Sequence, residues 1–160
     1  MAEVEIVQAD LSDLDQQQAV LSLLNSYAQD PIISGQPLTK EVQAALIEGL
    51  SQHPTTLVLM AYGDDTPVGL AVCFVGFSTF AAKPILNIHD LAVSANWRGQ
   101  GVGAKLLAAV EAQARRLGCC KVTLEVHDDN VPARAIYQAA GFGPSPSERQ
   151  CLFLYKKLPS

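Results

Sequence analysis

The chain has 160 residues, of which 49% are hydrophobic and 17% charged, a balance typical of a globular protein with one packed core. Its formal net charge of -5 argues against nucleic acid as the main partner, because nucleic-acid-binding proteins usually present a basic face. No apolar run approaches the length of a membrane span and the first residues are acidic, unlike a signal peptide, so we expect a cytoplasmic protein with no membrane partner.

The cysteines and histidines show no spacing typical of a metal site. Cysteines occur at 73, 119, 120 and 151, and none pairs with another at Cys-x-x-Cys spacing. Because adjacent cysteines bridge each other only under strain, we expect Cys119 and Cys120 to stay reduced. The histidines are scattered along the chain. We therefore expect reduced, mostly buried thiols, as in the cytosol, and no metal.

The periodicity of apolar side chains predicts the elements of the first half of the chain. Alternation indicates strands, and spacings of three and four residues indicate helices. Aspartates after Ser12, and Thr39 before an apolar ladder, are typical helix starts. We expect, in order, a strand at 4–9, a helix from Ser12 to about residue 28, a helix from Thr39, and strands at 55–62 and 67–77 joined by a hairpin turn.

The second half alternates between strands and helices. We expect a strand at 85–93, a helix that follows a glycine turn and stops at Gly118, a strand at 122–126, a short helix from Asn130 to Gly141, and a closing strand at 151–158. This order is that of a mixed α/β protein. No linker or repeat divides it, so we expect one domain over residues 1–160.

Three glycines gather at the mouth of the helix that follows the strand at 85–93. The sequence there is Arg98-Gly-Gln-Gly-Val-Gly103. Without Cβ atoms the backbone can approach a ligand closely, and the start of a helix offers unpaired N–H groups and partial positive charge. Arg98 can add a charged contact, so the turn predicts a phosphate site. Two familiar phosphate loops fit this turn badly. The nucleoside-triphosphate loop needs Gly-Lys-Ser/Thr, which does not occur here, and the dinucleotide loop needs Gly where Ala104 stands.

The pattern Arg-x-x-Gly-x-Gly between a strand and a helix resembles the acyl-CoA loop of the GNAT N-acetyltransferase superfamily. A second motif lies about 30 residues later, where Asn130, Tyr137 and Gly141 followed by Phe142 match the superfamily in order and spacing. Together the motifs cover roughly residues 85–142. The resemblance implies an α/β fold whose mixed central sheet has splayed middle strands flanked by helices, with acetyl-CoA as cosubstrate in the gap between those strands.

The resemblance also implies which residues contact the coenzyme. Backbone groups of the strand at 85–93 would bond the pantetheine arm and the acyl oxygen, and the glycine turn would hold the phosphates. The implied set is Leu91, Ala92, Val93, Arg98, Gly99, Gln100, Gly101, Val102, Gly103, Ala104, Asn130, Ala133 and Tyr137.

Acyl transfer to an amine needs a base for the ammonium proton and an acid for the leaving thiolate. Tyr137 matches the superfamily's frequent general acid. Two residues compete for the base: Glu125, placed as in enzymes that acetylate ribosomal protein N-termini, and His89, placed as in arylalkylamine acetyltransferases. A water chain could replace both. By strand alternation we expect Asn87 on the face of His89, and Asp90 on the opposite face, where it is a weaker candidate for the base.

We therefore expect an N-acetyltransferase that moves an acetyl group from acetyl-CoA to a primary amine of a small molecule, such as an amine, polyamine or amino acid. A protein N-terminal or lysine acetyltransferase and a non-catalytic acyl-CoA sensor are the alternatives. The resemblance places the acceptor pocket at the first helices, the loop at 32–35 and the region after Gly141. Dimers are common in the superfamily, so a homodimer is a further expectation, and no general motif fixes the acceptor.

Overall fold

The structure is a computed structural model that describes residues 3–146 and 149–160. Within these ranges the elements are β1 (Val4–Gln8), α1 (Leu14–Gln29), α2 (Lys40–Gln52), β2 (Thr56–Gly63), β3 (Thr66–Ser78), β4 (Lys83–Val93), a 3-10 turn (Ala95–Trp97), α3 (Val102–Arg116), β5 (Val122–Leu124) and α4 (Val131–Ala139). The strands follow chain order in one sheet, antiparallel except for the parallel pair β4 and β5. This confirms the mixed α/β fold.

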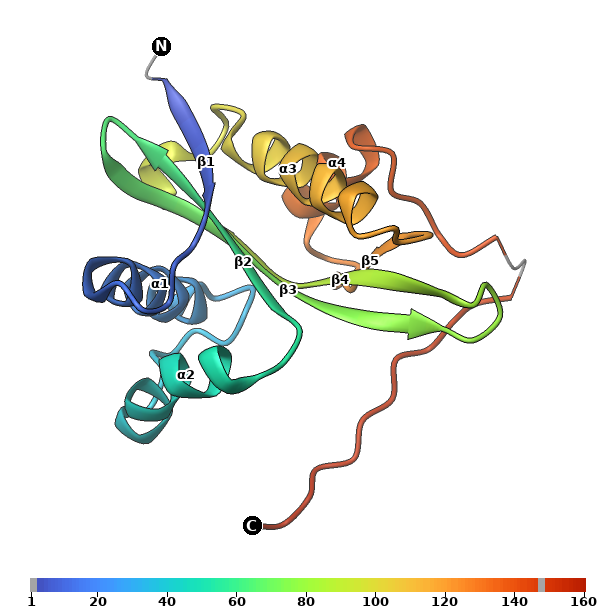
Figure 1. Ribbon diagram of the computed structural model, residues 1–160, viewed down its shortest axis with the longest axis horizontal. Coiled ribbons are helices and arrows are strands. Elements are labelled where there is room, and N and C mark those ends of the chain that lie inside the picture. Colours follow the sequence, from blue (N-terminus) through green and yellow to red (C-terminus); the bar gives the residue numbers. More distant parts are fainter. Residues whose placement is uncertain (1–2, 147–148) are drawn as a thin grey trace.

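The sheet has helices on both faces (Figure 1). α1 and α2 cover one face, and α3 and α4 lie on the other. Along β2 the side chains alternate between the two cores: Leu57 and Leu59 pack on the α3 face, whereas Val58 and Met60 pack against α1 and α2. Burial on both faces explains why β2 and β3 read as nearly continuous apolar runs.

The hairpin between β2 and β3 forms where the sequence predicts it. Asp64 and Asp65 both have positive φ, 50° and 61°, the conformation of a two-residue type I′ turn. Gly63 before them lies under the indole of Trp97, because a Cβ built there would be 2.4 Å from a ring carbon. The hairpin end therefore contacts the turn that leads to α3.

The helix starts match the prediction closely. Thr39 caps α2 as expected, by accepting a hydrogen bond from the Val42 N–H. α1 begins two residues later than predicted, because Asp13 is its cap, whereas the Ser12 hydroxyl donates to Asp10 Oδ1. In the described ranges no helix is long and apolar enough to cross a membrane.

The predicted closing strand at 151–158 is wrong. These residues carry no strand, and their large apolar side chains are exposed, from 67% for Leu152 to 84% for Tyr155. A strand needs a hydrogen-bonding neighbour as well as β-prone side chains, and the chain after α4 leads away from the sheet (Figure 1). The expectation of mostly buried thiols is also wrong in part, since Cys120 and Cys151 are exposed.

Candidate active site

Strand β4 has two neighbours along its first half and one along its second. In the described part of the chain β5 pairs with it at Leu86–Val122, Asn87–Thr123 and Ile88–Leu124, and nowhere further. Asn87 Nδ2 also donates a hydrogen bond to Thr123 Oγ1 over 3.0 Å. Beyond Ile88, β4 continues to Val93 beside β3 alone. The middle strands therefore diverge after Ile88, which confirms the predicted splay.

The unpaired half of β4 presents main-chain groups toward this gap. Ser94 N–H donates to Val68 O over 2.8 Å, so alternation along an antiparallel pair directs the main chain of Ala92 toward β3 as well. The main chains of Leu91 and Val93 then face away from β3. The 3.1 Å hydrogen bond from Arg98 Nε to Val93 O agrees with this direction. Among the described residues, the main chain of Leu91 and the N–H of Val93 thus face away from β3 toward the gap, whereas Val93 O already accepts from Arg98 and the main chain of Ala92 faces β3.

The start of α3 differs from the other helix starts. α1, α2 and α4 begin with the side-chain caps Asp13, Thr39 and Asn130, whereas α3 begins at Gly101 with no side-chain cap. Within residues 3–146 and 149–160, the N–H groups of its first turn have no side-chain acceptor. Unpaired N–H groups at a helix start attract anions through their direction and partial charge.

The glycine turn leaves open space beside these N–H groups. Gly99 and Gly101 have φ of 73° and 83°, the left-handed region that favours glycine. A Cβ built at either residue would meet no atom within 4 Å. Bare backbone therefore borders an open volume, which fits a diphosphate laid across the turn.

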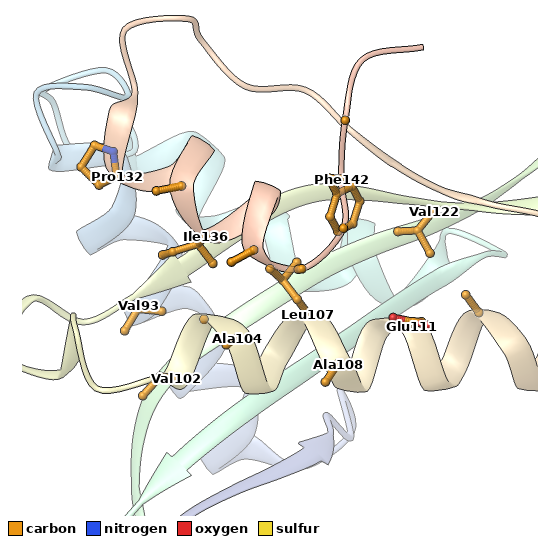
Figure 2. Close-up of a pocket in the computed structure, with 18 of the residues that line it drawn as sticks. Val93, Val102, Ala104, Leu107, Ala108, Glu111, Val122, Pro132, Ile136 and Phe142 are labelled. Carbon is orange, nitrogen blue, oxygen red and sulfur yellow. The ribbon is translucent and has the colours of Figure 1, made fainter. Parts of the chain in front are cut away.

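A groove of about 1190 Å³ continues from this turn between α3 and α4. Figure 2 shows Val102, Ala104 and Leu107 of α3 on one side, with Pro132 and Ile136 of α4 across from them. Arg98, Gly99 and Val93 also line the groove. Between its ends the walls are mostly apolar, as suits the slender arm of a coenzyme; Arg98 lines one end, and Glu111, Arg115 and Lys121 line the other.

Three of the predicted coenzyme residues are engaged elsewhere. The Asn130 side chain accepts a hydrogen bond from the Ala133 N–H at 3.3 Å, which caps α4. Gln100 Nε2 donates to Asn96 O over 2.8 Å. Among the groove-lining residues, neither Asn130 nor Ala133 appears, although Pro132 between them does.

Tyr137 lies on α4 and is half-buried beside Phe142, with ring centroids 6.0 Å apart. Burial raises the pKa of its phenol above the ordinary value of 10.0, and the charge of Asp90 raises it further. The pKa of Tyr27, on α1, is raised to about 12 by burial and then by Asp90, Tyr137 and Asp30. Side chains from α1, β4 and α4 therefore influence one another across the splay, and both phenols stay protonated near neutral pH.

The two predicted bases lie at the edges of this cluster. His89 is exposed, and its ring makes an edge contact with Phe74 at 5.6 Å between centroids. Glu125 is exposed and directly follows the last residue of β5, at the mouth of the gap. Among the described residues, no hydrogen bond or ring contact joins either side chain to Tyr137.

The prediction for Asp90 is wrong because β4 contains a bulge. Ile88 pairs with Cys73 and Asp90 with the adjacent Val72, so His89 is an extra residue in β4. Val72 packs on the α1 and α2 face, and residues directly opposite in an antiparallel pair share a face. Phe74, which contacts His89, packs on that face too. The bulge therefore puts both His89 and Asp90 on the face of the sheet that α1 and α2 cover.

Arg98 connects the glycine turn to the loop after α1. Its Nη2 lies 3.0 Å from Asp30 Oδ2, with the Arg98 side chain 53% exposed and that of Asp30 22% exposed. Arg98 is thus held at the groove entrance by Asp30 and Val93 O. A diphosphate in the turn would compete with Asp30 for the guanidinium.

Sequence reasoning missed Tyr27, Asp30 and Asp90 as members of the site. Tyr27 and Asp30 come together with β4 only through tertiary packing, so no local pattern reveals them. Asp90 follows a bulge that no glycine or proline marks. The one available signal was a carboxylate beside a histidine in a mostly apolar strand.

The sequence matches known acetyltransferases. The profile of the Acetyltransferase (GNAT) family matches residues 20–142. The chain is similar to a thialysine N-epsilon-acetyltransferase of Bos taurus, 29% identical over 130 residues, which cover 76% of this chain and 75% of the relative. It is also similar to an aminoglycoside N(6')-acetyltransferase type 1 of Stenotrophomonas maltophilia, 34% identical over 79 residues, or 49% and 50% of the two chains.

A solved structure has the same fold. Aminoglycoside N-acetyltransferase AAC(6')-Iy, crystallised with CoA, superposes with a TM-score of 0.74 over 98% of this chain and 96% of its own, at 19% identity. The chain belongs to the Acetyltransferase (GNAT) family and is an acyl-CoA-dependent N-acetyltransferase.

Proposed function

We propose that the protein transfers the acetyl group of acetyl-CoA directly to a primary amine of a small molecule. The observation that carries this proposal is the uncapped start of α3, which opens with Arg98 onto a groove leading to the β4–β5 splay. The names of the thialysine and aminoglycoside relatives support a small amine as acceptor.

The coenzyme would be held along this path. The N–H groups at the start of α3 and the guanidinium of Arg98 suit a diphosphate. The main chains of Leu91 and Val93 suit the amide groups of the pantetheine arm, as one strand pairs with another. The bound coenzyme supplies an activated thioester; this chain orients it and handles the protons.

Tyr137 is proposed as the acid that protonates the leaving thiolate. Its raised pKa keeps the phenol protonated over the whole neutral range, so the proton is available at every working pH. Tyr137 lies on α4, and the charge of Asp90 on β4 influences its pKa, which supports a position near the gap that would receive the thioester. Glu125 and His89 stay as candidate bases, each exposed at the edge of that gap.

The test measures release of free CoA thiol with a panel of small amines and a lysine-containing peptide. We expect turnover with small amines, and Tyr137→Phe to lower it about 100-fold, the usual contribution of a general acid, with acetyl-CoA affinity within twofold of wild type. Tyr155→Phe is the matched control, because Tyr155 is 84% exposed in the C-terminal segment. Turnover with the peptide alone would mean that the acceptor is a protein amine and not a small molecule. No turnover with any acceptor would refute the proposal.

A further inference from the structure

The last residues of the chain form an apolar surface that the rest of the chain does not cover. We call residues 151–158 the C-terminal arm. Its consecutive residues Leu152, Phe153, Leu154 and Tyr155 are 67% to 84% exposed, and Leu158 is 78% exposed. Figure 1 shows this red segment running away from the sheet. Because large apolar side chains that gather on a surface mark interaction sites, the arm is a candidate for contact with a partner.

Both faces of the arm are apolar. In an extended chain Leu152 and Leu154 lie on one side, and Phe153 and Tyr155 lie on the other. A strand with one face in water alternates apolar and polar residues, whereas a strand covered on both faces is apolar throughout, as β2 is. The arm therefore has the pattern of a strand that is paired within a sheet and covered on both of its faces.

The outer edge of β5 offers a place for such a strand. β-prone residues continue from Val122 to Val126, but only Val122–Leu124 forms a strand, and Val126 is 40% exposed. Among the described residues, β5 pairs with β4 on one side and with no strand on the other. Both β5 and the arm thus form less strand than their sequences predict, and each would supply the neighbour that the other lacks.

The opposite edge of the sheet is less suited to pairing. β1 carries the exposed Glu5 in its middle, and the carbonyl of its first residue, Val4, accepts a hydrogen bond from Lys105 Nζ over 3.3 Å. Charged side chains along an edge strand oppose pairing with another strand. Val122–Leu124 contains no charged residue. We therefore place the arm at β5 and not at β1.

The arm does not lie on the β5 edge of its own chain. In residues 3–146 and 149–160 the sheet ends at β5, and the arm carries no strand. The connection that leads to it contains Pro144 and Pro146, whose fixed φ favours an extended path. A second copy presents the same free edge. Since each chain has one arm and one such edge, two copies can exchange arms about a two-fold axis with neither left over.

The charges of the arm and of the rest of the chain agree with this exchange. The arm contains Lys156 and Lys157 and no carboxylate, whereas the whole chain has a net charge of -5. The chain outside the arm is therefore acidic. Opposite charges attract two surfaces and orient them before they dock. A second copy of this chain thus suits the arm in charge as well as in apolar character.

We propose that the protein is a homodimer in which the C-terminal arm of each copy pairs as a strand with β5 of the other copy. The exchange covers the apolar rows of the arm and gives β5 a second neighbour. Val122 of β5 also lines the groove between α3 and α4, so the exchanged arm extends a wall of that groove. The inference does not depend on the proposed acetyl transfer, because its test measures mass and contact and not turnover.

The first measurement is the mass of the full chain by analytical ultracentrifugation. It compares wild type, the double variant Leu152→Asp/Leu154→Asp and the control Leu14→Asp. All three leucines are exposed within a single chain, so the substitutions leave its core intact, which far-UV circular dichroism checks. Leu14 is the matched control because it is 77% exposed but lies at the start of α1, outside the arm.

We expect wild type at micromolar concentration to have twice the chain mass of 17.1 kDa. The double variant places two carboxylates in the proposed interface, so its dimer dissociation constant should rise about 100-fold. Leu14→Asp should dimerise as wild type does.

The second measurement locates the arm in the dimer. Tyr155 is replaced by the photoreactive aromatic residue p-benzoylphenylalanine, and the illuminated protein is separated under denaturing conditions. We expect a covalent product of twice the chain mass, with the crosslink in the tryptic peptide 122–134, which follows Lys121 and contains β5. A crosslink within one chain would leave the mass unchanged, so the product mass distinguishes exchange from an arm that folds back on its own chain.

Each of the contrary outcomes has a definite meaning. A monomeric wild type would assign the arm to a different partner and refute the exchange. A folded double variant that dimerises like wild type would place the interface elsewhere. An equal loss in Leu14→Asp would show that the arm has no special part in dimerisation. A crosslink of single-chain mass, or one outside peptide 122–134, would reject the pairing with β5 of the second copy.

Discussion

The starts of α3 and α4 lie at the same groove and are built in opposite ways. α4 begins with Asn130, whose side chain accepts from the Ala133 N–H, and has proline in its first turn. α3 begins with Gly101 in the left-handed region and has no side-chain cap. One helix start satisfies its own donors, and the other leaves them for a ligand. The missing side-chain cap therefore marks the start of α3 as the proposed binding site more clearly than its glycine content does.

The largest expected effect comes from filling the start of α3. Gly101→Asp adds a carboxylate and a Cβ where the open space beside the turn would receive phosphate oxygens. We expect CoA affinity to fall about 100-fold, equal to roughly 2.7 kcal/mol. Isothermal calorimetry with CoA measures it.

Gly118→Asp is the matched control, because Gly118 has φ of 72° and open space around it but lies beyond the other end of α3. It should bind CoA as wild type does. Equal losses in the two variants would mean that the added charge weakens binding wherever it stands, and not because it lies at the start of α3.

The second effect tests the support beneath the glycine turn. In Gly63→Ala the new Cβ meets three ring atoms of Trp97 at 2.4 to 2.9 Å, so the indole must move. We expect a loss of about 2 kcal/mol in the free energy of unfolding, measured by denaturant titration, with weaker CoA binding. Gly49→Ala, in α2 with no atom within 4 Å, should instead stabilise by about 1 kcal/mol. Equal stability of the two variants would show that the Trp97 indole can move aside at no cost in free energy.

The third effect isolates the guanidinium from the backbone donors. Arg98→Ala removes one charged partner from an entrance that is half-exposed, so we expect a roughly tenfold loss of CoA affinity, smaller than that of Gly101→Asp. Arg116→Ala is the control, because Arg116 contacts Gln113 in the last turn of α3. Undiminished affinity in Arg98→Ala would mean that the N–H groups at the start of α3 bind the phosphates without help from Arg98.

The smallest effect belongs to the capped helix. Asn130→Ala deletes the acceptor for the Ala133 N–H and should cost about 1 kcal/mol of unfolding free energy, seen as a lower thermal midpoint. Asn130→Asp keeps a capping oxygen and should restore most of it. CoA affinity should fall less than in Arg98→Ala; a larger loss would mean that Asn130 also touches the coenzyme, as the family resemblance implies.

Local patterns were sufficient for most of the fold. Strand alternation, the Thr39 cap and the glycine turn each depend on neighbours in sequence, so they could be predicted. The bulge at His89 could not, because it arises from pairing with β3, and it reverses the face of Asp90. The closing strand failed for the same reason, since β-prone residues do not supply a pairing partner. Tyr137 was found through its motif, whereas Tyr27 needed the packing of α1.

The unequal attachment of the two walls of the splay has a consequence for motion. In the described residues β4 pairs with β3 from Lys83 to Val93 except at the bulge, whereas β5 pairs with β4 over three residues only. Two backbone hydrogen bonds just before β5 and the Asn87–Thr123 hydrogen bond add to this attachment. Local opening follows the weaker attachment. The amides of β5 should therefore exchange with deuterium sooner than those of β4, and the cleft should open by motion of its β5 wall while the β4 wall stays in place.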